Sequence, residues 1–196
     1  MELYYATTNA GKILSLQREF SETAVRVIQA PIDTPEPRSS DVQEIACYKV
    51  RAAYEQLKKP VAALDAGFYI PSLNGFPRAF INFALETIDL EGMLALVQGK
   101  ERLCEFRDCL AYQDPSLNEP QSFIGHTPGM LAEKPRGEIK PYHWSRLSRI
   151  FIPDGSTKTL AEMSEHEYHE WRALARKKTS PARQFAQWLL PRVSKN

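Results

Sequence analysis

Charged residues that could bind phosphate or metal occur at four separate places in the sequence: Lys12, Glu36, Lys49 and Asp65. Lys12 closes the stretch Thr8-Asn9-Ala10-Gly11-Lys12, which lies between an apolar run and a run of helical spacing. A helix N-terminus offers unpaired N–H groups to an anion, Gly allows close approach of the backbone, and Lys adds a positive charge. The stretch therefore fits a phosphate-binding loop without the Walker spacing, or an ordinary turn with a surface Lys.

The two acids have different surroundings. Glu36 lies between Pro35 and Pro37, which would hold its carboxylate on a stiff loop. There it could bind Mg²⁺ together with phosphate oxygens, or it could be a solvated loop acid. Asp65 follows the apolar run Val61–Leu64, and the carboxyl ends of strands line the ligand crevices of α/β sheets. Because burial of an unpaired acid is costly, we favour a functional role for Asp65 over a helix or turn cap.

Other candidate residues have plainer alternatives. Lys49 lies on a predicted helix, from which it could reach a phosphate or remain solvated. Trp144 could stack on a nucleobase or pack against the protein. His166 and His169 lie near several Glu residues, but their spacing is not that of the His-Glu-x-x-His zinc motif. A polar helix face is the favoured interpretation of the two histidines.

Hydrophobic periodicity predicts alternating strands and helices in the first part of the chain. The predicted elements are a strand at Leu3–Ala6, a helix from Ile13 to Phe20, a strand at Val25–Ile28, a helix at Asp41–Leu57 and a strand at Val61–Leu64. Asp41 is a suitable N-cap for the second helix, and Glu44 stands three residues later, as in a capping box.

Hairpin signals are typical of the later part. The expected elements are short helices within Arg78–Val97, strands at Leu103–Tyr112 and Gln121–Ile124, further pairing at Met130–Leu131, a strand at Ile150–Ile152, and one or two helices in Glu165–Leu190 divided near Ser180-Pro181. A βαβ start followed by hairpins predicts an α/β fold, with a mixed central sheet flanked by helices.

The bulk composition limits the class of protein. The 196 residues are 43% hydrophobic and 25% charged, which suits one globular domain spanning residues 1–196. A formal net charge of +1 argues against a dedicated nucleic-acid binder. No apolar run approaches the ~18 residues of a membrane span, and the N-terminus lacks the pattern of a signal peptide. We therefore expect a cytoplasmic protein, whose three cysteines are reduced thiols without a catalytic role.

Taken in order, several stretches resemble the inosine triphosphate pyrophosphatase family, the non-canonical purine NTP pyrophosphatases. The matching stretches are Ala6–Lys12, Ile32–Glu36, Glu44–Lys49, Pro60–Asp65, Leu73–Pro77, Phe123–Gly125, Pro135–Gly137, Phe151–Gly155 and Thr159–Met163. No single stretch is specific, whereas their ordered succession over nearly the whole chain is.

The resemblance implies an elongated central sheet with two lobes around a nucleotide cleft, usually in a homodimer. It also implies Mg²⁺-dependent hydrolysis of the α–β phosphate bond of a nucleoside triphosphate, giving a monophosphate and pyrophosphate. The implied roles are neutralisation of the triphosphate by Lys12 and Lys49, phosphate contacts from Thr8 and Asn9, metal binding by Glu36, and general-base catalysis or metal binding by Asp65.

The departures from the family pattern leave the phosphate-binding end partly preserved and the base-binding end largely rewritten. They are Leu64 for the first of two adjacent acids, Ser15 for a Glu, Arg78 for a Gly, Ser145–Arg149 for the base-holding F-G-[WY]-D-P motif, and Tyr168-His169-Glu170 for S-H-R. A pocket that loses its polar contacts loses its selectivity for one base. We therefore predict altered base specificity, with Trp144 or Tyr142 as a stacking face and His169 or Glu170 as a polar contact.

Two other functions remain open from the sequence. The loss of acids at Leu64 and Ser15 favours a nucleotide-binding homologue without catalysis. A structural protein with a vestigial cleft is the other alternative. The retained set of Lys12, Glu36, Lys49 and Asp65 argues against the structural role.

Overall fold

The computed structural model describes residues 1–32, 34 and 37–193. The strands are β1 (Glu2–Ala6), β2 (Arg26–Ala30), β3 (Val61–Tyr69), β4 (Pro77–Arg78), β5 (Leu103–Gln113), β6 (Gln121–Leu131) and β7 (Phe151–Pro153). The α-helices are α1 (Ala10–Glu19), α2 (Val42–Leu57), α3 (Ile81–Thr87), α4 (Asp89–Leu96), α5 (Glu165–Thr179) and α6 (Pro181–Val193). Three 3₁₀ helices cover Pro71–Leu73, Arg146–Arg149 and Leu160–Glu162.

The seven strands form one mixed sheet in the order β2-β1-β3-β5-β6-β7, with β4 paired to β3. β1 pairs in parallel with β2 and β3, as a βαβ start requires, whereas β6 pairs antiparallel with β7. The predicted mixed α/β fold is therefore confirmed. No helix among the described residues is both long and apolar enough to cross a membrane.

The chain divides into two compact units. Unit 1 comprises residues 1–66, 108–125 and 179–196, and unit 2 comprises residues 67–107 and 126–178. β3, β5 and β6 each contribute residues to both units. Each unit has its own apolar core, and each core is made only of residues from that unit.

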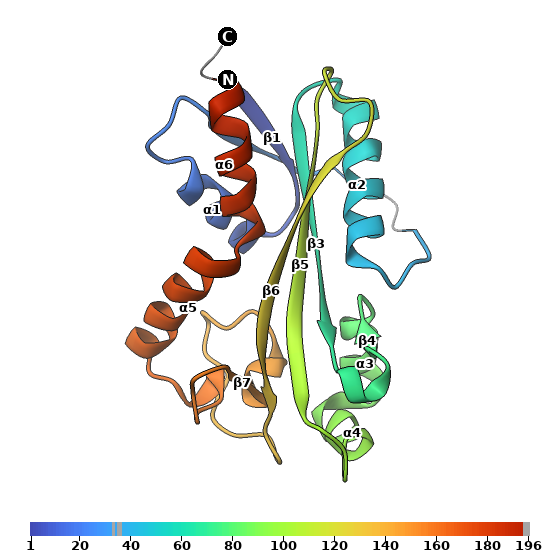
Figure 1. Ribbon diagram of the computed structural model, residues 1–196, viewed down its shortest axis with the longest axis vertical. Coiled ribbons are helices and arrows are strands. Elements are labelled where there is room, and N and C mark those ends of the chain that lie inside the picture. Colours follow the sequence, from blue (N-terminus) through green and yellow to red (C-terminus); the bar gives the residue numbers. More distant parts are fainter. Residues whose placement is uncertain (33, 35–36, 194–196) are drawn as a thin grey trace. The chain divides into compact units, whose positions relative to one another are not determined.

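Helices cover the two faces of the sheet in unit 1. Figure 1 shows α1 and α6 on one side of the strands and α2 on the other. The core beneath α1 and α6 includes Leu16, Phe20 and Phe185. The helix α2 buries an apolar face that includes Ile45 and Val50, which leaves its polar residues for other contacts.

The long strand β3 corrects one predicted boundary. We expected the strand to end at Leu64, before Asp65, but it continues to Tyr69, so Asp65 lies in its middle. Pairing with β4 extends the strand. A Cβ atom at Gly67 would lie 2.8 Å from the carbonyl oxygen of Arg78. This Gly therefore permits the close approach of β4 and does not mark a strand end.

The strand β6 corrects a second boundary. The predicted segments Gln121–Ile124 and Met130–Leu131 belong to one continuous strand. Its two glycines and one proline interrupt the hydrophobic pattern, so the sequence suggested a break. A Cβ at Gly125 would collide with the carbonyl of Thr179, and one at Gly129 would collide with the carbonyl of Ile152.

The helix ends confirm two predictions and contradict one. α5 ends at Thr179 and α6 begins at Pro181, so the predicted division is confirmed. Asp41 is the N-cap of α2, and its side chain accepts a 2.8 Å hydrogen bond from the Gln43 N–H. The expected capping box is wrong, because Glu44 accepts a hydrogen bond from the Ser39 hydroxyl and not from the Asp41 N–H.

Candidate active site

A nearly buried ion pair joins α2 to the middle of β3. The ammonium nitrogen Nζ of Lys49 donates a hydrogen bond to Oδ1 of Asp65 at 2.8 Å. The two side chains are only 15% and 14% exposed. Since a charge removed from water is costly unless it is paired, each side chain offsets the desolvation of the other. The pair brings together two residues that the sequence separated by 16 positions.

Lys12 reaches the same part of β3 from the first turn of α1. Its Nζ donates a 3.2 Å hydrogen bond to the backbone carbonyl of Leu64. The parallel pairing of β1 with β3 matches Tyr4 with Val61 and Tyr5 with Ala62. This register brings the end of β1, and therefore the start of α1, beside the Leu64 stretch. Two ammonium groups and one carboxylate thus gather at two adjacent residues of β3.

The N-terminus of α1 lies next to this cluster in sequence. Asn9 is the N-cap, and its side-chain oxygen accepts a 3.1 Å hydrogen bond from the Lys12 N–H. The Asn9 N–H in turn donates to the Thr7 hydroxyl at 3.1 Å. With the Asn9 oxygen used as a cap, its amide NH₂ is the group that could donate to a phosphate. Thr8 and Asn9 are both exposed in this turn.

Leu64 occupies the position at which the family resemblance implies an acid. Its side chain is half-buried and packs against the core of unit 1. Successive side chains of a strand point to opposite faces of the sheet. The Leu64 side chain therefore lies on the face opposite to that of Asp65. A second acid at position 64 would not have pointed toward Lys49.

Only part of the predicted metal site lies within the described residues. Glu36 falls outside them. The Asp65 carboxylate has the hard oxygen donors that Mg²⁺ prefers, and phosphate oxygens would supply others. In this structure one oxygen of that carboxylate is engaged by Lys49. The residues present therefore fit a magnesium ion. The ion would either share the Asp65 carboxylate with Lys49 or replace Lys49 as its partner.

In unit 2, the segment that replaces the base-holding motif packs into the protein. Arg146–Arg149 form a 3₁₀ helix in which Leu147 and Ser148 are buried, at 1% and 2% exposed. Arg146 donates to the carbonyl of Leu85 at 2.8 Å and pairs with Asp89 at 3.2 Å. These contacts support the structure of unit 2, and burial makes Leu147 and Ser148 unavailable to a ligand.

The two residues proposed for the base contact are both accessible in unit 2. Trp144 is 49% exposed, and its ring lies 4.4 Å from that of Phe106 in a tilted arrangement. The indole ring therefore packs partly against Phe106, and the residue stays half-exposed. His169 lies on α5, where its Nε2 is 3.6 Å from Glu165 and its ring is 5.8 Å from that of Tyr142. The described contacts do not include one between Trp144 and His169.

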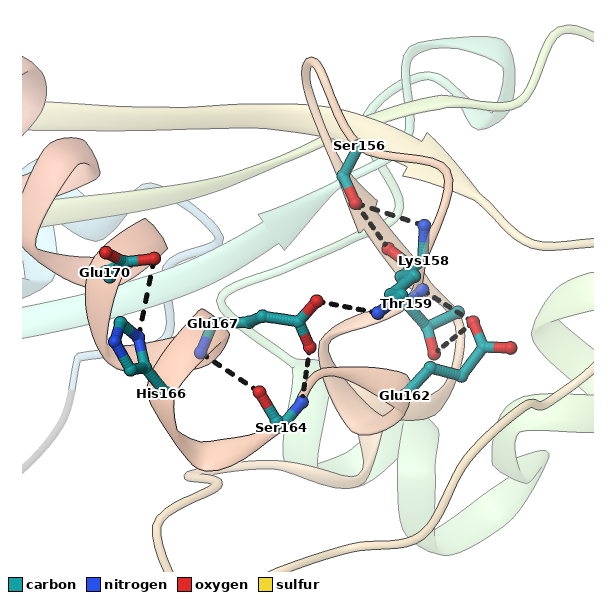
Figure 2. Close-up of polar contacts among 8 residues, drawn as sticks. All are labelled: Ser156, Lys158, Thr159, Glu162, Ser164, His166, Glu167 and Glu170. Atoms are coloured by element: carbon teal, nitrogen blue, oxygen red, sulfur yellow. Dashed lines mark hydrogen bonds and ion pairs between the residues drawn. The ribbon is translucent and has the colours of Figure 1, made fainter.

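Figure 2 shows a network of polar contacts that anchors the start of α5. Glu167 accepts a 2.7 Å hydrogen bond from the Ser164 N–H, and the Ser164 hydroxyl accepts one from the Glu167 N–H at 3.3 Å. Lys158 donates to Glu167 at 2.7 Å. The lysine, followed by the Ser164 donors, lowers the pKa of Glu167 to about 2. The Ser-x-x-Glu pattern of a capping box was present in the sequence and could have revealed this anchor.

The Lys12 contact with Leu64 was not foreseen, and no sequence signal could have revealed it. Its acceptor is a backbone carbonyl, which every residue possesses. By contrast, the four charged positions themselves were predicted from residue type and local context. The structure brings Lys12, Lys49 and Asp65 together.

Comparison with known proteins identifies relatives over nearly the whole length. The sequence model of the Ham1 family matches residues 3–181. A dITP/XTP pyrophosphatase of Methanopyrus kandleri is 35% identical over 193 residues, covering 96% of each chain. One of Thermococcus kodakarensis is 32% identical, covering 96% of this chain and 97% of that protein. The Staphylococcus aureus Ham1 protein has a similar fold, with a TM-score of 0.75, 24% identity, and coverage of 100% of this chain and 99% of that one.

Proposed function

Because the chain belongs to the Ham1 family, as its resemblance to the inosine triphosphate pyrophosphatases implied, we propose that it is a nucleoside triphosphate pyrophosphohydrolase. The proposed reaction cleaves the α–β phosphate bond of a non-canonical (d)NTP and gives the monophosphate and pyrophosphate. The observation that carries this proposal is the convergence of Lys12, Lys49 and Asp65 on one stretch of β3. The names of the Methanopyrus and Thermococcus relatives support it.

The proposed chemistry assigns a task to each side chain of the cluster. Lys12 and Lys49 neutralise the triphosphate oxygens, and Thr8 and Asn9 donate to them at the start of α1. Asp65 accepts a proton from water while the water oxygen bonds to the α-phosphorus. The bond from the α-phosphorus to the bridging oxygen then breaks, and pyrophosphate leaves. Charge neutralisation and a positioned water are the general needs of phosphoryl transfer.

Mg²⁺ is the proposed cofactor, held by the carboxylates of Asp65 and Glu36. A bound magnesium ion would neutralise phosphate charge and orient the triphosphate. Addition of a chelator should abolish pyrophosphate release, and Mg²⁺ should restore it. Full activity in the presence of the chelator would contradict the assignment.

Altered base specificity is proposed on the evidence of unit 2. Leu147 and Ser148 are buried where the family motif holds a base, so base contacts must come from other residues. Trp144 and His169 are exposed and carry the chemistry for stacking and hydrogen bonding. Comparison of kcat/KM for ITP, XTP and a panel of modified purine and pyrimidine triphosphates tests this. A clear preference for ITP or XTP would reject it.

Pyrophosphate release from the same panel tests the activity itself, beside an Asp65→Asn control. Turnover of at least one triphosphate that Asp65→Asn reduces by a factor of 10² or more is the expected result. Tight nucleotide binding without turnover, by a folded protein, would instead identify a nucleotide-binding homologue. Ser15, which stands where the family resemblance implies an acid near the metal, is the feature that favours this second function.

From the family resemblance we propose that the protein is a homodimer. Each subunit is proposed to be a single domain of residues 1–196. Light scattering coupled to size exclusion should give twice the monomer mass of 22.3 kDa. A mass that stays at 22.3 kDa over a wide concentration range would refute the dimer.

A further inference from the structure

Lys49 contacts Asp65 in the structure, and the proposed function gives it a second acidic partner, the triphosphate. In the free protein its ammonium group lies 2.8 Å from Asp65, and both side chains are nearly buried. The proposed function, on which this inference rests, gives the same ammonium group to the triphosphate. An ammonium has three donors, but a triphosphate held next to Asp65 would place like charges close together in a poorly solvated place. Such repulsion is much stronger there than in water.

We propose that the Lys49–Asp65 pair is a contact that the substrate opens. In the free protein, Lys49 compensates the charge of Asp65 and restrains its carboxylate against α2. When a triphosphate binds, its oxygens take the ammonium group, and Asp65 is released to hold the attacking water. Lys49 is then a positioning residue for Asp65 as well as a phosphate ligand.

The geometry explains why one group can serve both purposes. Lys49 is fixed on the long helix α2, whose apolar face is buried. Asp65 is fixed in the middle of β3. Neither backbone needs to move for the contact to open, because the four-carbon side chain of a lysine can turn to a new acceptor. Opening therefore requires a sufficiently charged ligand and no rearrangement of the fold.

The contact would therefore link binding of the triphosphate to the catalytic readiness of Asp65. While Lys49 holds Asp65, one oxygen of the carboxylate is engaged by a donor, so the water-activating arrangement is incomplete. A ligand with fewer phosphate charges competes less well for the ammonium group. The pair thus favours the triphosphate over the monophosphate product by more than the phosphate contacts alone would do.

A double-mutant cycle in binding tests the proposal without any turnover. The ligand is inorganic tripolyphosphate in a metal-free buffer with chelator, and titration calorimetry gives Kd for wild type, Asp65→Asn, Lys49→Met and the double variant. Asp65→Asn should bind tripolyphosphate roughly tenfold more tightly than wild type (about 1.4 kcal/mol) because the Asp65 carboxylate no longer competes for the Lys49 ammonium group. In the Lys49→Met background, the gain in affinity from Asp65→Asn should be several-fold smaller, because only charge repulsion between Asp65 and the ligand is relieved.

The matched control is Glu55→Gln on the same helix. Glu55 forms an exposed pair with Lys58 at the end of α2, so this variant removes one negative charge without touching the site. Its Kd should equal that of the wild type. Circular dichroism verifies folding, and Lys49→Gln replaces Lys49→Met if the latter unfolds. A crystal structure with bound tripolyphosphate gives a second measurement, in which the distance from Lys49 Nζ to Asp65 should exceed 4 Å.

The outcomes separate this proposal from the proposed function. An equal gain in affinity from Asp65→Asn in both backgrounds would show that Asp65 acts only by charge repulsion. Weaker binding by Asp65→Asn would show that the pair prepares Lys49 for phosphate. Either result overturns the proposal. No binding by any variant would overturn it together with the phosphate role of Lys49. The expected cycle in a protein that hydrolyses no triphosphate would support the opening contact and reject only the catalysis.

Discussion

Leu64 and Asp65 are neighbours in β3, yet their side chains belong to opposite faces of the sheet. Leu64 packs against the core of unit 1, whereas Asp65 receives the ammonium group of Lys49 from α2. The replacement of an acid by Leu64 therefore changes the core face and leaves the surroundings of Asp65 in place. This relationship explains how the Lys49–Asp65 pair can form although Leu64 stands where the resemblance implies an acid.

Restoring an acid at position 64 should destabilise the protein. Leu64→Ala is expected to cost about 2 kcal/mol of unfolding free energy, at the low end for Leu because the side chain is only half-buried. Leu64→Asp should cost roughly 1–3 kcal/mol more, because it places a polar group against the core. Urea unfolding measures both values. Equal stability of the Asp and Ala variants would show that position 64 is solvated.

Trp144→Ala should weaken nucleotide binding without affecting phosphate binding. Stacking of a base on an aromatic ring contributes about 1–3 kcal/mol, so Kd for a nucleoside triphosphate should rise by roughly 5- to 100-fold. Calorimetry with the preferred nucleotide and with tripolyphosphate measures the two effects separately. Trp144→Phe, which keeps an aromatic face, serves as the control. Equal losses for both ligands would indicate damage to the fold and not to a base contact.

The Glu167 anchor of α5 predicts a dependence of stability on pH. Its pKa in the folded protein is lowered from 4.5 to about 2, mainly by the hydrogen bond from Lys158. A carboxylate with a lowered folded-state pKa stabilises the protein above its unfolded pKa, and this contribution is lost as the pH falls through the folded value. Glu167→Gln should therefore lower Tm at pH 7, and the difference from wild type should shrink between about pH 4.5 and pH 2.

Thermal unfolding from pH 7 to pH 2 checks this prediction, with Glu133→Gln as an exposed control outside α5. A Tm difference between wild type and Glu167→Gln that stays constant over this pH range would show that the carboxylate charge does not anchor the helix.

Gly125→Ala should destabilise the junction of α5 and α6. The added methyl group would collide with the carbonyl of Thr179 and with the ring of Pro181. Overpacking of this kind costs typically about 1–3 kcal/mol. Gly155→Ala is a suitable comparison, because it adds strain from a φ of +80° but meets no atom within 4 Å. Denaturant unfolding should rank Gly125→Ala as the more destabilised variant, and the reverse order would mean that α6 shifts to accommodate the methyl group.

Local patterns in the sequence were sufficient for much of the architecture. Hydrophobic periodicity predicted the βαβ start and the helix that follows Asp41, and the break at Pro181 followed from the chemistry of proline. Such features depend on neighbouring residues, so one sequence can reveal them. The ordered motifs likewise pointed to the family that the comparisons confirm.

Boundaries that depend on distant strands were predicted less well. β3 runs on beyond Asp65 because β4 pairs with it, and β6 continues through two glycines because other backbones approach closely there. Neither partner is near in sequence, so the local pattern suggested an end where the structure has a continuous strand.

The sequence by itself determined which residues carry charge in a site of this kind, among them Lys12, Lys49 and Asp65. Only the tertiary structure decided that Lys49 holds Asp65, that Lys12 bonds the carbonyl of Leu64, and that Leu64 faces the core. The physical reason is that residue type fixes charge and hydrogen-bonding capacity locally, whereas the partner of each group is set by strand register and by the packing of helices on the sheet.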